Sequence, residues 1–453
     1  MGQGTRLASF AAGLNWNDAP PPLRTKVLDH VVDTVGVMFA GIDMPSCAGA
    51  RRAAAEWGRA DDATVVGTAE RAPAAGAAFL NALHGRIHTY DDTYEPGTMH
   101  PGSPVIAAAL ALAERHAADG PRFLCAVLAG YEVAARVAAA VSPGHYAAGF
   151  HNTGTCTVFG AAAAAARLLG LDGPACAETL GLAGATAGGL RQHQIDGSML
   201  DSAFHGARAA QSGVMVAQMR ACGVGGPPAI LEGPLGFCAV MAPSRDLSRL
   251  DADLGERYEF AQMTVKPYAT CRFAQGPTEA ALELRRNHCI DPAQIEDVEI
   301  ATFRQSIEVS DRPALASAFD ATVSHQYSVA LALVRGAVPL DAIRRPETAG
   351  EQVHDVRRRV RVVHDAELER EFPRCWPHRV TITMRDGRRF AARSDYPPGR
   401  TSPVPSATVD AKFAENAAPY LGDAGARRAL EALRALEACG DVGRVARLLA
   451  AAT

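Results

Sequence analysis

Hydrophobic residues recur at helical spacing through most of the first 265 residues. Within residues 23–41, Val27, Val31 and Val35 fall on one face of a helix that ends at Gly41. The same spacing predicts three further helices: one at residues 103–120, opened by Ser103 and closed by Gly120, and two at residues 157–171 and 204–223. Their many alanines would let neighbouring helices approach closely. The pattern therefore predicts a large helical domain.

The pattern changes near residue 266, where strand-like runs begin to alternate with helices. Three segments read as strands, at residues 295–303, 358–365 and 378–394. The last of them contains Asp386-Gly387 between alternating residues, which indicates a hairpin. A Pro-rich connector follows, and helical spacing then resumes. We expect a mainly α fold made of three parts: an all-helical domain (1–265), an inserted, smaller α/β (α+β) domain (266–400), and C-terminal helices (401–453) that return to the first domain.

Composition excludes several classes of protein. The formal charge of −4 gives no electrostatic footprint for nucleic acid. Ten cysteines without a CxxC pair are typical of reduced thiols in a cytosolic protein. The N-terminus lacks the basic and apolar regions of a signal peptide, and charged residues interrupt the longest apolar run. We expect a cytoplasmic protein that binds neither nucleic acid nor membrane.

The segment "HTYDDTYEPGTMHPGSP" contains the first candidate site. Asp91, Asp92 and His100 could form a metal site, an acid/base site or only a polar loop. His84 and His88 are four residues apart and would share a helix face. A metal is not favoured, because the diagnostic HExxH spacing is missing. The acid/base interpretation is better, since histidine titrates near neutrality and a carboxylate can hold its tautomer.

Two further polar segments could contribute to a site. His151 precedes a helix start, where free N–H groups would attract a carboxylate; capping by the residues that follow is the alternative. Lys266 and Arg272 could bind carboxylates, or could form only a charged junction between domains. Cys271 has no neighbouring base in the sequence, which leaves a nucleophilic role unsupported. Tyr327 precedes an apolar helix, where a core role is the alternative.

Several motifs, in this order along the chain, resemble the MmgE/PrpD family. They are "VVDTVGVMFAG", "YDDT" with "HPGSPVIAAALALAE", "GYEVAARV", "GFHNTGT", "GAAAAAARLLGL", "HGARAAQSG", "KPYATCRF", "QYSVALALVRG" and "YPPG". The resemblance implies a large helical domain with a small α/β lid, a homodimer, and an active site between the domains. It also implies chemistry on a small-molecule carboxylate without a metal or other cofactor.

The resemblance also assigns roles by position. Catalytic roles fall on five residues: Thr93, His100, His151, Lys266 and Tyr327. Substrate-binding roles fall on six: Thr89, Asp92, Ser202, His205, Cys271 and Arg272. Asp91 and Asp92 match the acidic pair of the family.

This chain departs from the family pattern at several of these positions. Arg86 and Thr89 stand where members commonly have a histidine and an aspartate, and Ser202 replaces a lysine. A histidine often found after the "KPYxCCRF" run is Gln275 here. Loss of one acid together with one cation indicates a compensated change of charge, because paired loss is better tolerated than single loss. We expect a substrate that differs from those of the best-known members.

The activities of this family share a carbanion formed or quenched next to a carboxylate. We therefore expect a lyase, either a 2-methylcitrate dehydratase-like hydro-lyase or a cis-aconitate decarboxylase-like enzyme. Two alternatives stay open, an epimerase like iminodisuccinate epimerase and a repurposed, non-catalytic homologue.

Overall fold

The computed structural model describes residues 1–451, apart from the side chains of residues 199–201, and the chain folds into two compact units. The larger unit comprises Met1–Ile87, Asp91–Met263 and the chain from Pro405 onward. The smaller unit comprises Thr264–Val404 together with the short segment His88–Tyr90. The sequence placed the changes of domain at residues 265 and 400. It gave no sign that three residues of the first domain would join the second unit.

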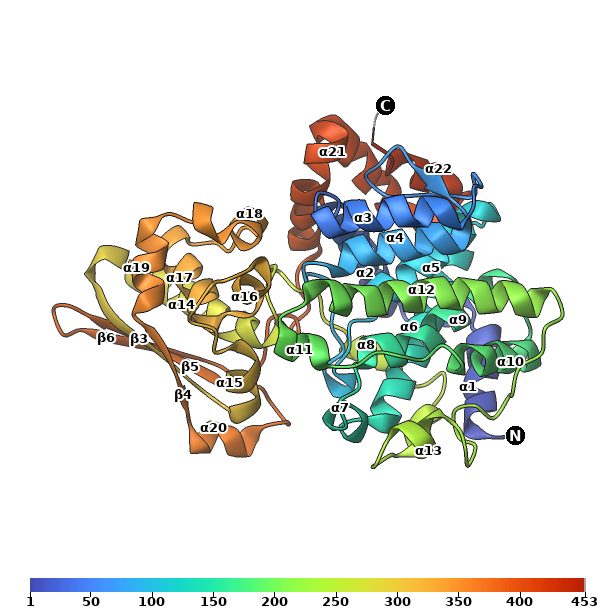
Figure 1. The fold of residues 1–453 in the computed structure, drawn as a ribbon, viewed down its shortest axis with the longest axis horizontal. Coiled ribbons are helices and arrows are strands. Elements are labelled where there is room, and N and C mark those ends of the chain that lie inside the picture. The colour runs from blue at the N-terminus through green and yellow to red at the C-terminus, as the bar shows by residue number, and fades with distance from the viewer. Residues whose placement is uncertain (452–453) are drawn as a thin grey trace. The chain divides into compact units, whose positions relative to one another are not determined.

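The larger unit is almost entirely helical, and the chain as a whole is mainly α, as predicted (Figure 1). Its helices are α1 (Gln3–Gly13), α2 (Pro21–Ala40), α3 (Pro45–Ala54), α4 (Ala74–Arg86), α5 (Gly102–Arg115), α6 (Gly120–Val141), α7 (Gly144–Ala147), α8 (Asn152–Thr155), α9 (Thr157–Leu168), α10 (Gly173–Gly184), α11 (Gln192–Asp196), α12 (Met199–Ala221), α13 (Phe237–Met241), α21 (Ser406–Arg434) and α22 (Val442–Leu448). A two-stranded antiparallel ribbon accompanies them, formed by β1 (Ala63–Thr64) and β2 (Arg71–Ala72).

Small residues allow the central helices of the larger unit to pack closely. Helix α9 packs against α5, α6 and α12. A Cβ atom added to Gly160 of α9 would lie 2.5 Å from the carbonyl oxygen of Gly130 on α6 and 2.7 Å from the Cβ atom of Ala134. Real Cβ atoms do not tolerate such distances, so only glycine fits there. The expectation of close helix packing in this segment is confirmed.

The C-terminal helix α21 packs beside α2 near the N-terminus (Figure 1). Lys412 of α21 forms an ion pair with Asp33 of α2, with 2.7 Å between Nζ and Oδ1. Both side chains are buried, and burial raises the pKa of Asp33 to about 6 although Lys412 opposes that shift. Segments almost 400 residues apart in the sequence are thus joined by a buried charge pair.

Two predicted details of α5 are wrong. The helix ends at Arg115, and Gly120 begins α6 instead of ending α5. The side chain of Asp119 explains the new start, because it accepts a hydrogen bond from the N–H of Arg122 and so caps α6. Ser103 does not cap α5; its hydroxyl donates to Asp91 Oδ2 at 3.0 Å.

The smaller unit is built around a four-stranded sheet with the order β4-β3-β5-β6 (Figure 1). The strands are β3 (Ile295–Thr302), β4 (Val360–His364), β5 (His378–Met384) and β6 (Arg389–Ser394). Its helices are α14 (Arg272–His288), α15 (Arg304–Ser310), α16 (Ala318–Val323), α17 (His325–Arg335), α18 (Leu340–Arg344), α19 (Glu351–Arg358) and α20 (Ala366–Glu371). The β5–β6 hairpin is confirmed, and Gly387 has the positive φ of 86° that its turn requires.

Among the residues that the structure describes, one helix, α6, is by itself long and apolar enough to cross a membrane, and the bent pair Pro21–Ala40 and Pro45–Trp57 would be a second span only if taken together; the apolar window of α6 is entirely buried inside the larger unit. Core helices of soluble globular proteins meet the same criteria, so the finding favours a core role for α6. All ten cysteines are free thiols, as the sequence predicts.

Candidate active site

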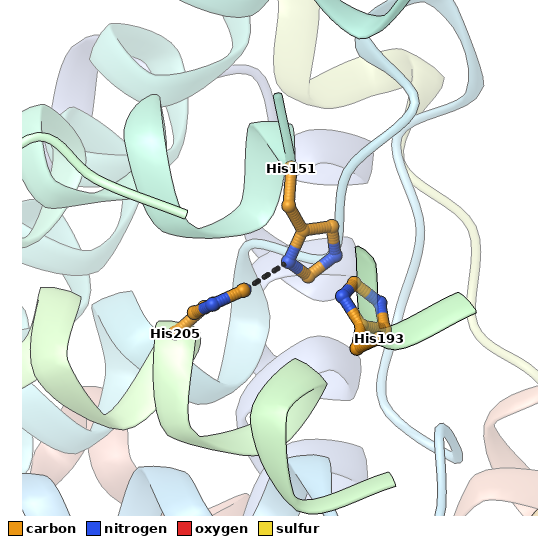
Figure 2. Close-up of side chains that lie close together, drawn as sticks. All are labelled: His151, His193 and His205. Atoms are coloured by element: carbon orange, nitrogen blue, oxygen red, sulfur yellow. Dashed lines mark hydrogen bonds between the residues drawn. The ribbon is translucent and has the colours of Figure 1, made fainter. Parts of the chain in front are cut away.

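Three histidine side chains converge in the larger unit (Figure 2). His151 precedes α8, His193 lies on α11 and His205 lies on α12. The backbone N–H of His151 donates to the carbonyl oxygen of Gly189 at 3.0 Å, which ties its segment to the chain that leads into α11. The ring of His151 lies 4.8 Å from that of His193 and 5.1 Å from that of His205, measured between centroids. Each residue offers one ring nitrogen, and the three nitrogens lie within 4.8 Å of one another.

Hydrogen bonds restrict the protonation of this cluster. The Nδ1 atoms of His151 and His205 are 2.9 Å apart, so one ring donates and the other accepts. His193 donates from Nδ1 to the carbonyl oxygen of Leu190 at 3.0 Å, which makes its Nε2 the acceptor. Burial, and then the positive charge that His193 and Arg86 would place nearby, lower the pKa of His151 well below 6.5. His151 is therefore a neutral imidazole at pH 7.

Arg86, the last residue of α4, forms a buried ion pair with Asp91. Its Nη1 atom lies 2.9 Å from Asp91 Oδ1, and the two side chains are 2% and 0% exposed. The second guanidinium branch donates to Ser202 Oγ at 3.1 Å. The sequence suggested that the loss of a lysine at position 202 removes a cation from the site. The structure places the guanidinium of Arg86 at the hydroxyl of Ser202, so a positively charged group lies at this position although the lysine is absent.

The carboxylate of Asp92 is surrounded by donors from the protein itself. Its Oδ2 accepts from the hydroxyl of Tyr131 at 2.5 Å and lies 2.7 Å from Nδ1 of His30, and its Oδ1 accepts from the N–H of Gly102 at 2.8 Å. The side chain is fully buried. With both oxygens engaged by the protein, this geometry opposes the expected substrate-binding role of Asp92. It favours the role of ordering the loop.

His100 and Thr93 lie on that loop. His100 Nδ1 donates to the carbonyl oxygen of Asp92 at 2.8 Å and lies 3.4 Å from Thr93 Oγ1. This bond makes Nε2 the nitrogen that can accept a proton. The backbone N–H of His100 donates to Thr153 Oγ1 at 3.1 Å, two residues beyond His151. The larger unit thus brings the segments of His100 and His151 together.

The other expected site residues belong to the smaller unit. Lys266 is fully buried, and its Nζ donates to the carbonyl oxygen of Thr89. Thr89 has a φ of 52°, in the left-handed region that a β-branched residue rarely adopts. The segment around Thr89 is further held because Tyr90 donates from its hydroxyl to the carbonyl oxygen of Pro267 at 3.1 Å. The short segment that joins the smaller unit is therefore fixed by hydrogen bonds to residues 266 and 267.

Arg272 begins α14, and Cys271 precedes it. Arg272 Nη1 donates to the carbonyl oxygen of Pro398 at 2.9 Å, and the backbone N–H of Cys271 donates to the carbonyl oxygen of Thr322 at 2.8 Å. Gln275 donates from its side-chain amide to Thr270 Oγ1 at 2.7 Å. These bonds hold the loop before α14 in place, and they give Gln275 a structural role.

Tyr327 lies in the core of the smaller unit. Its hydroxyl donates to the carbonyl oxygen of Ala342 at 2.7 Å, and its side chain is fully buried in the smaller unit. Burial raises its pKa to about 12. These contacts fit the core role considered as its alternative, and the catalytic role of Tyr327 stays a prediction.

His84 and His88 do not share a helix face, because α4 ends at Arg86 and the two residues belong to different units. His88 Nε2 accepts from Arg344 Nε at 3.2 Å. The sequence also missed His193 as a member of the cluster. No local motif marks it, since its partners are 42 and 12 residues away and only the fold brings them together.

Comparisons with known proteins cover nearly the whole chain. The N-terminal domain of the MmgE/PrpD family matches residues 5–250, and its C-terminal domain matches residues 268–438. The chain is 25% identical to cis-aconitate decarboxylase of Mus musculus, over 98% of this chain and 92% of that protein. It is 24% identical to the cis-aconitate decarboxylase-like protein oryM of Aspergillus oryzae, over 98% and 96%, and 25% identical to cis-aconitate decarboxylase of Homo sapiens, over 86% and 82%.

Proposed function

The chain belongs to the MmgE/PrpD family, and from that premise we propose that it is a decarboxylase-type lyase of a small polycarboxylate. The observation that carries the proposal is the near-full-length similarity to relatives named cis-aconitate decarboxylase. The convergence of three histidines, among them the neutral His151, beside a buried guanidinium in the larger unit supports it. At about 25% identity the substrate is open, and we infer its class from the chemistry that follows.

Decarboxylation requires a group that stabilises the electron pair left on the substrate carbon, and an acid that supplies one proton. The bond between a carbon atom and its carboxylate breaks, carbon dioxide leaves, and the electron pair stays on the substrate carbon. That carbanion is stabilised when a double bond or a second carboxylate lies next to it. A proton then forms the new C–H bond, so the site must deliver an acid to that carbon.

We assign this proton to the His151–His205 pair. In the free protein His151 is neutral, because burial and neighbouring positive charge lower its pKa. A polycarboxylate bound beside it would bring negative charge into the same buried region and raise that pKa again. The proton would thus be taken up with the substrate. Nδ1 of His205, 2.9 Å from Nδ1 of His151, can stabilise the proton once it is there.

Arg86 is the cation of the larger unit that we assign to the substrate. Its charge is matched by that of Asp91 in the ion pair, and its second branch donates to the uncharged hydroxyl of Ser202. A guanidinium recognises a carboxylate in bidentate fashion. Roles for Lys266 and Arg272 as carboxylate ligands, and for His100 as a second proton carrier, stay predictions.

The deciding experiment is a substrate screen with product analysis. Purified full-length protein is incubated in deuterated water with cis-aconitate, citrate, 2-methylcitrate and iminodisuccinate, and products are followed by NMR together with released carbon dioxide. A decarboxylase releases carbon dioxide and places one deuterium on the product, either at the former carboxylate-bearing carbon or, where a double bond lies next to it, at the far end of that double bond. A dehydratase forms an alkene, and an epimerase only exchanges the α-proton. Turnover without carbon dioxide would contradict the proposal, as would no turnover of any of these acids.

Variants test the acid. Loss of a general acid costs roughly 100- to 10,000-fold in rate, so His151→Gln should lower kcat by that factor. His116→Gln, at an exposed position of the same unit, is the control and should leave kcat unchanged. Because the pKa of His151 is low in the free protein, kcat/KM should keep rising as the pH falls through 6.5. A profile that levels off near pH 6.5 would contradict the assignment.

A further inference from the structure

The three-histidine cluster has a composition and geometry that proton transfer alone does not require. One histidine and one hydrogen-bonded partner suffice to carry a proton. Here His193 is a third imidazole, contributed by a separate helix, and its ring stands edge-on to that of His151 with an interplanar angle of 62° (Figure 2). Its nitrogen lies within 4.8 Å of one nitrogen on each of the other two rings. Three imidazole nitrogens gathered in this way are the donor set of a tetrahedral metal site with one open position, and small side-chain rotations would bring them to ligand distance.

The protonation of the cluster suits metal binding. Only neutral imidazole binds a metal, and burial keeps His151 neutral. No proton has to leave the His151–His205 pair: the ring that donates from Nδ1 can carry its hydrogen on Nε2 instead, which frees both Nδ1 lone pairs. The bond between His193 Nδ1 and the Leu190 carbonyl at 3.0 Å is the outer contact that orients a ligating histidine and fixes its tautomer.

Nearby charges decide which ion fits and how tightly it binds. Arg86 and Arg191 both act to lower the pKa of His151, so both would repel a cation. Asp91 neutralises Arg86 within the buried ion pair, and the guanidinium of Arg191 lies 3.7 Å above the ring of Tyr146. Among the clustered ligands there is no carboxylate, which disfavours Mg²⁺ and Ca²⁺ and favours the ions that prefer imidazole.

We propose that His151, His193 and His205 bind one divalent transition-metal ion of the Zn²⁺ class, with a fourth position open to water or a carboxylate. The evidence for this metal site is the geometry of the three histidines, and it does not depend on the proposed activity. Its effect on turnover rests on the proposed function: an ion on His151 occupies the lone pair that would carry the proton, so the ion is an inhibitor of the reaction and not its cofactor.

Cobalt is the probe, because Co²⁺ replaces Zn²⁺ and its visible absorption reports the number of ligands. Full-length protein is freed of metal with a chelator and titrated with Co²⁺ at pH 7.5. The exposed thiols Cys222 and Cys289 are the competing soft ligands and are changed to serine in every sample. We expect one equivalent to produce the intense visible bands of a four- or five-coordinate ion, without the near-ultraviolet band of a thiolate ligand.

The matched variants are His193→Ala and His116→Ala. Loss of an outer-shell partner costs roughly 10- to 100-fold in metal affinity, so loss of the ligand His193 should weaken Co²⁺ binding by at least that factor. His116→Ala should bind as the parent does. Circular dichroism checks that both variants are folded. Leu190 is not substituted, because His193 contacts only its backbone carbonyl oxygen. Weak six-coordinate spectra in the parent, or equal affinity in His193→Ala, would overturn the site.

Turnover provides the second readout, with Zn²⁺ added to the parent protein. Half-inhibition, measured at substrate concentrations well below KM, should fall near the Zn²⁺ dissociation constant obtained from displacement of bound Co²⁺. If Co²⁺ binds as expected and no carboxylate is turned over, the metal site stands and the proposed function fails. If turnover is found and Zn²⁺ at saturation does not slow it, the inhibitory role is overturned.

Discussion

The buried ion pair between Arg86 and Asp91 allows a quantitative test of the larger unit. Its charged atoms are 2.9 Å apart, and the side chains are 2% and 0% exposed. At an effective dielectric constant of about 20, two unit charges about 4 Å apart attract by about 4 kcal/mol. Changing Arg86 to Met removes that attraction and leaves Asp91 buried with the hydroxyl of Ser103 as a remaining donor. An uncompensated buried charge of this kind costs about 3–5 kcal/mol of unfolding free energy.

A double-mutant cycle separates the ion pair from packing effects. Arg86→Met and Asp91→Asn should each destabilise the larger unit by about 3–5 kcal/mol, because each leaves one charge without its partner. The double variant should cost less than the sum by at least about 2 kcal/mol, since no charge is then left behind. The hydroxyl of Ser202 loses a donor in both Arg86 variants, so that effect cancels in the cycle.

The measurement must report on the larger unit, because two units need not unfold in one step. Of the three tryptophans, Trp16 and Trp57 lie in the larger unit and Trp376 lies in the smaller. In a Trp376→Phe background, denaturant unfolding followed by fluorescence therefore reports on the larger unit alone. A coupling energy below about 0.5 kcal/mol, the usual error of additivity, would refute the reasoning.

Three further predictions concern stability. Burial lowers the pKa of His84 to about 3, so between that pH and 6.5 the unfolded chain binds a proton that the folded chain does not, and the parent protein loses stability as the pH falls. His84→Gln removes this loss and should gain about 1.4 kcal/mol of stability relative to the parent for each pH unit from roughly pH 6 down to pH 4. Urea unfolding at several pH values measures the difference. Lys412→Met should lower the free energy of unfolding by about 3–5 kcal/mol, because it leaves the carboxylate of Asp33 buried without its partner, and adding Asp33→Leu should restore most of that loss. A double variant that melts at no higher temperature than Lys412→Met alone would contradict this. Gly160→Ala should destabilise by about 1–3 kcal/mol through its clash with a carbonyl oxygen of α6, whereas Gly13→Ala, with open space around it, should be neutral or stabilising; equal melting temperatures would contradict the packing argument.

The hydrophobic pattern was sufficient to predict the elements that local rules control. The spacing of Val27, Val31 and Val35 places α2 within a few residues of its true bounds. The Asp386-Gly387 turn identifies the β5–β6 hairpin, because positive φ at Gly387 is a property of the turn itself. The end of α5 was missed because two signals compete at Gly120, which can end one helix or follow the capping Asp119 that begins the next.

The candidate site depended much more on tertiary contacts. The sequence shows that His100 and His151 are polar residues at loop and helix boundaries, and the family resemblance adds their roles. It does not show that the hydroxyl of Tyr327 is consumed by a backbone carbonyl, or that Asp92 is held by three donors. Burial and hydrogen-bond satisfaction belong to the folded chain, and they decide which polar side chains are available for chemistry.

By itself, then, the sequence determined the class of fold, the succession of helical and strand segments, the reduced cysteines and the family. These follow from local periodicity, turn chemistry and ordered motifs, which are written in neighbouring residues. Tertiary structure alone decided that Arg86 reaches Ser202 and that His193 joins His151 and His205. Such contacts join residues dozens of positions apart, and no local signal encodes them, because they arise only when helix packing fixes where each side chain points.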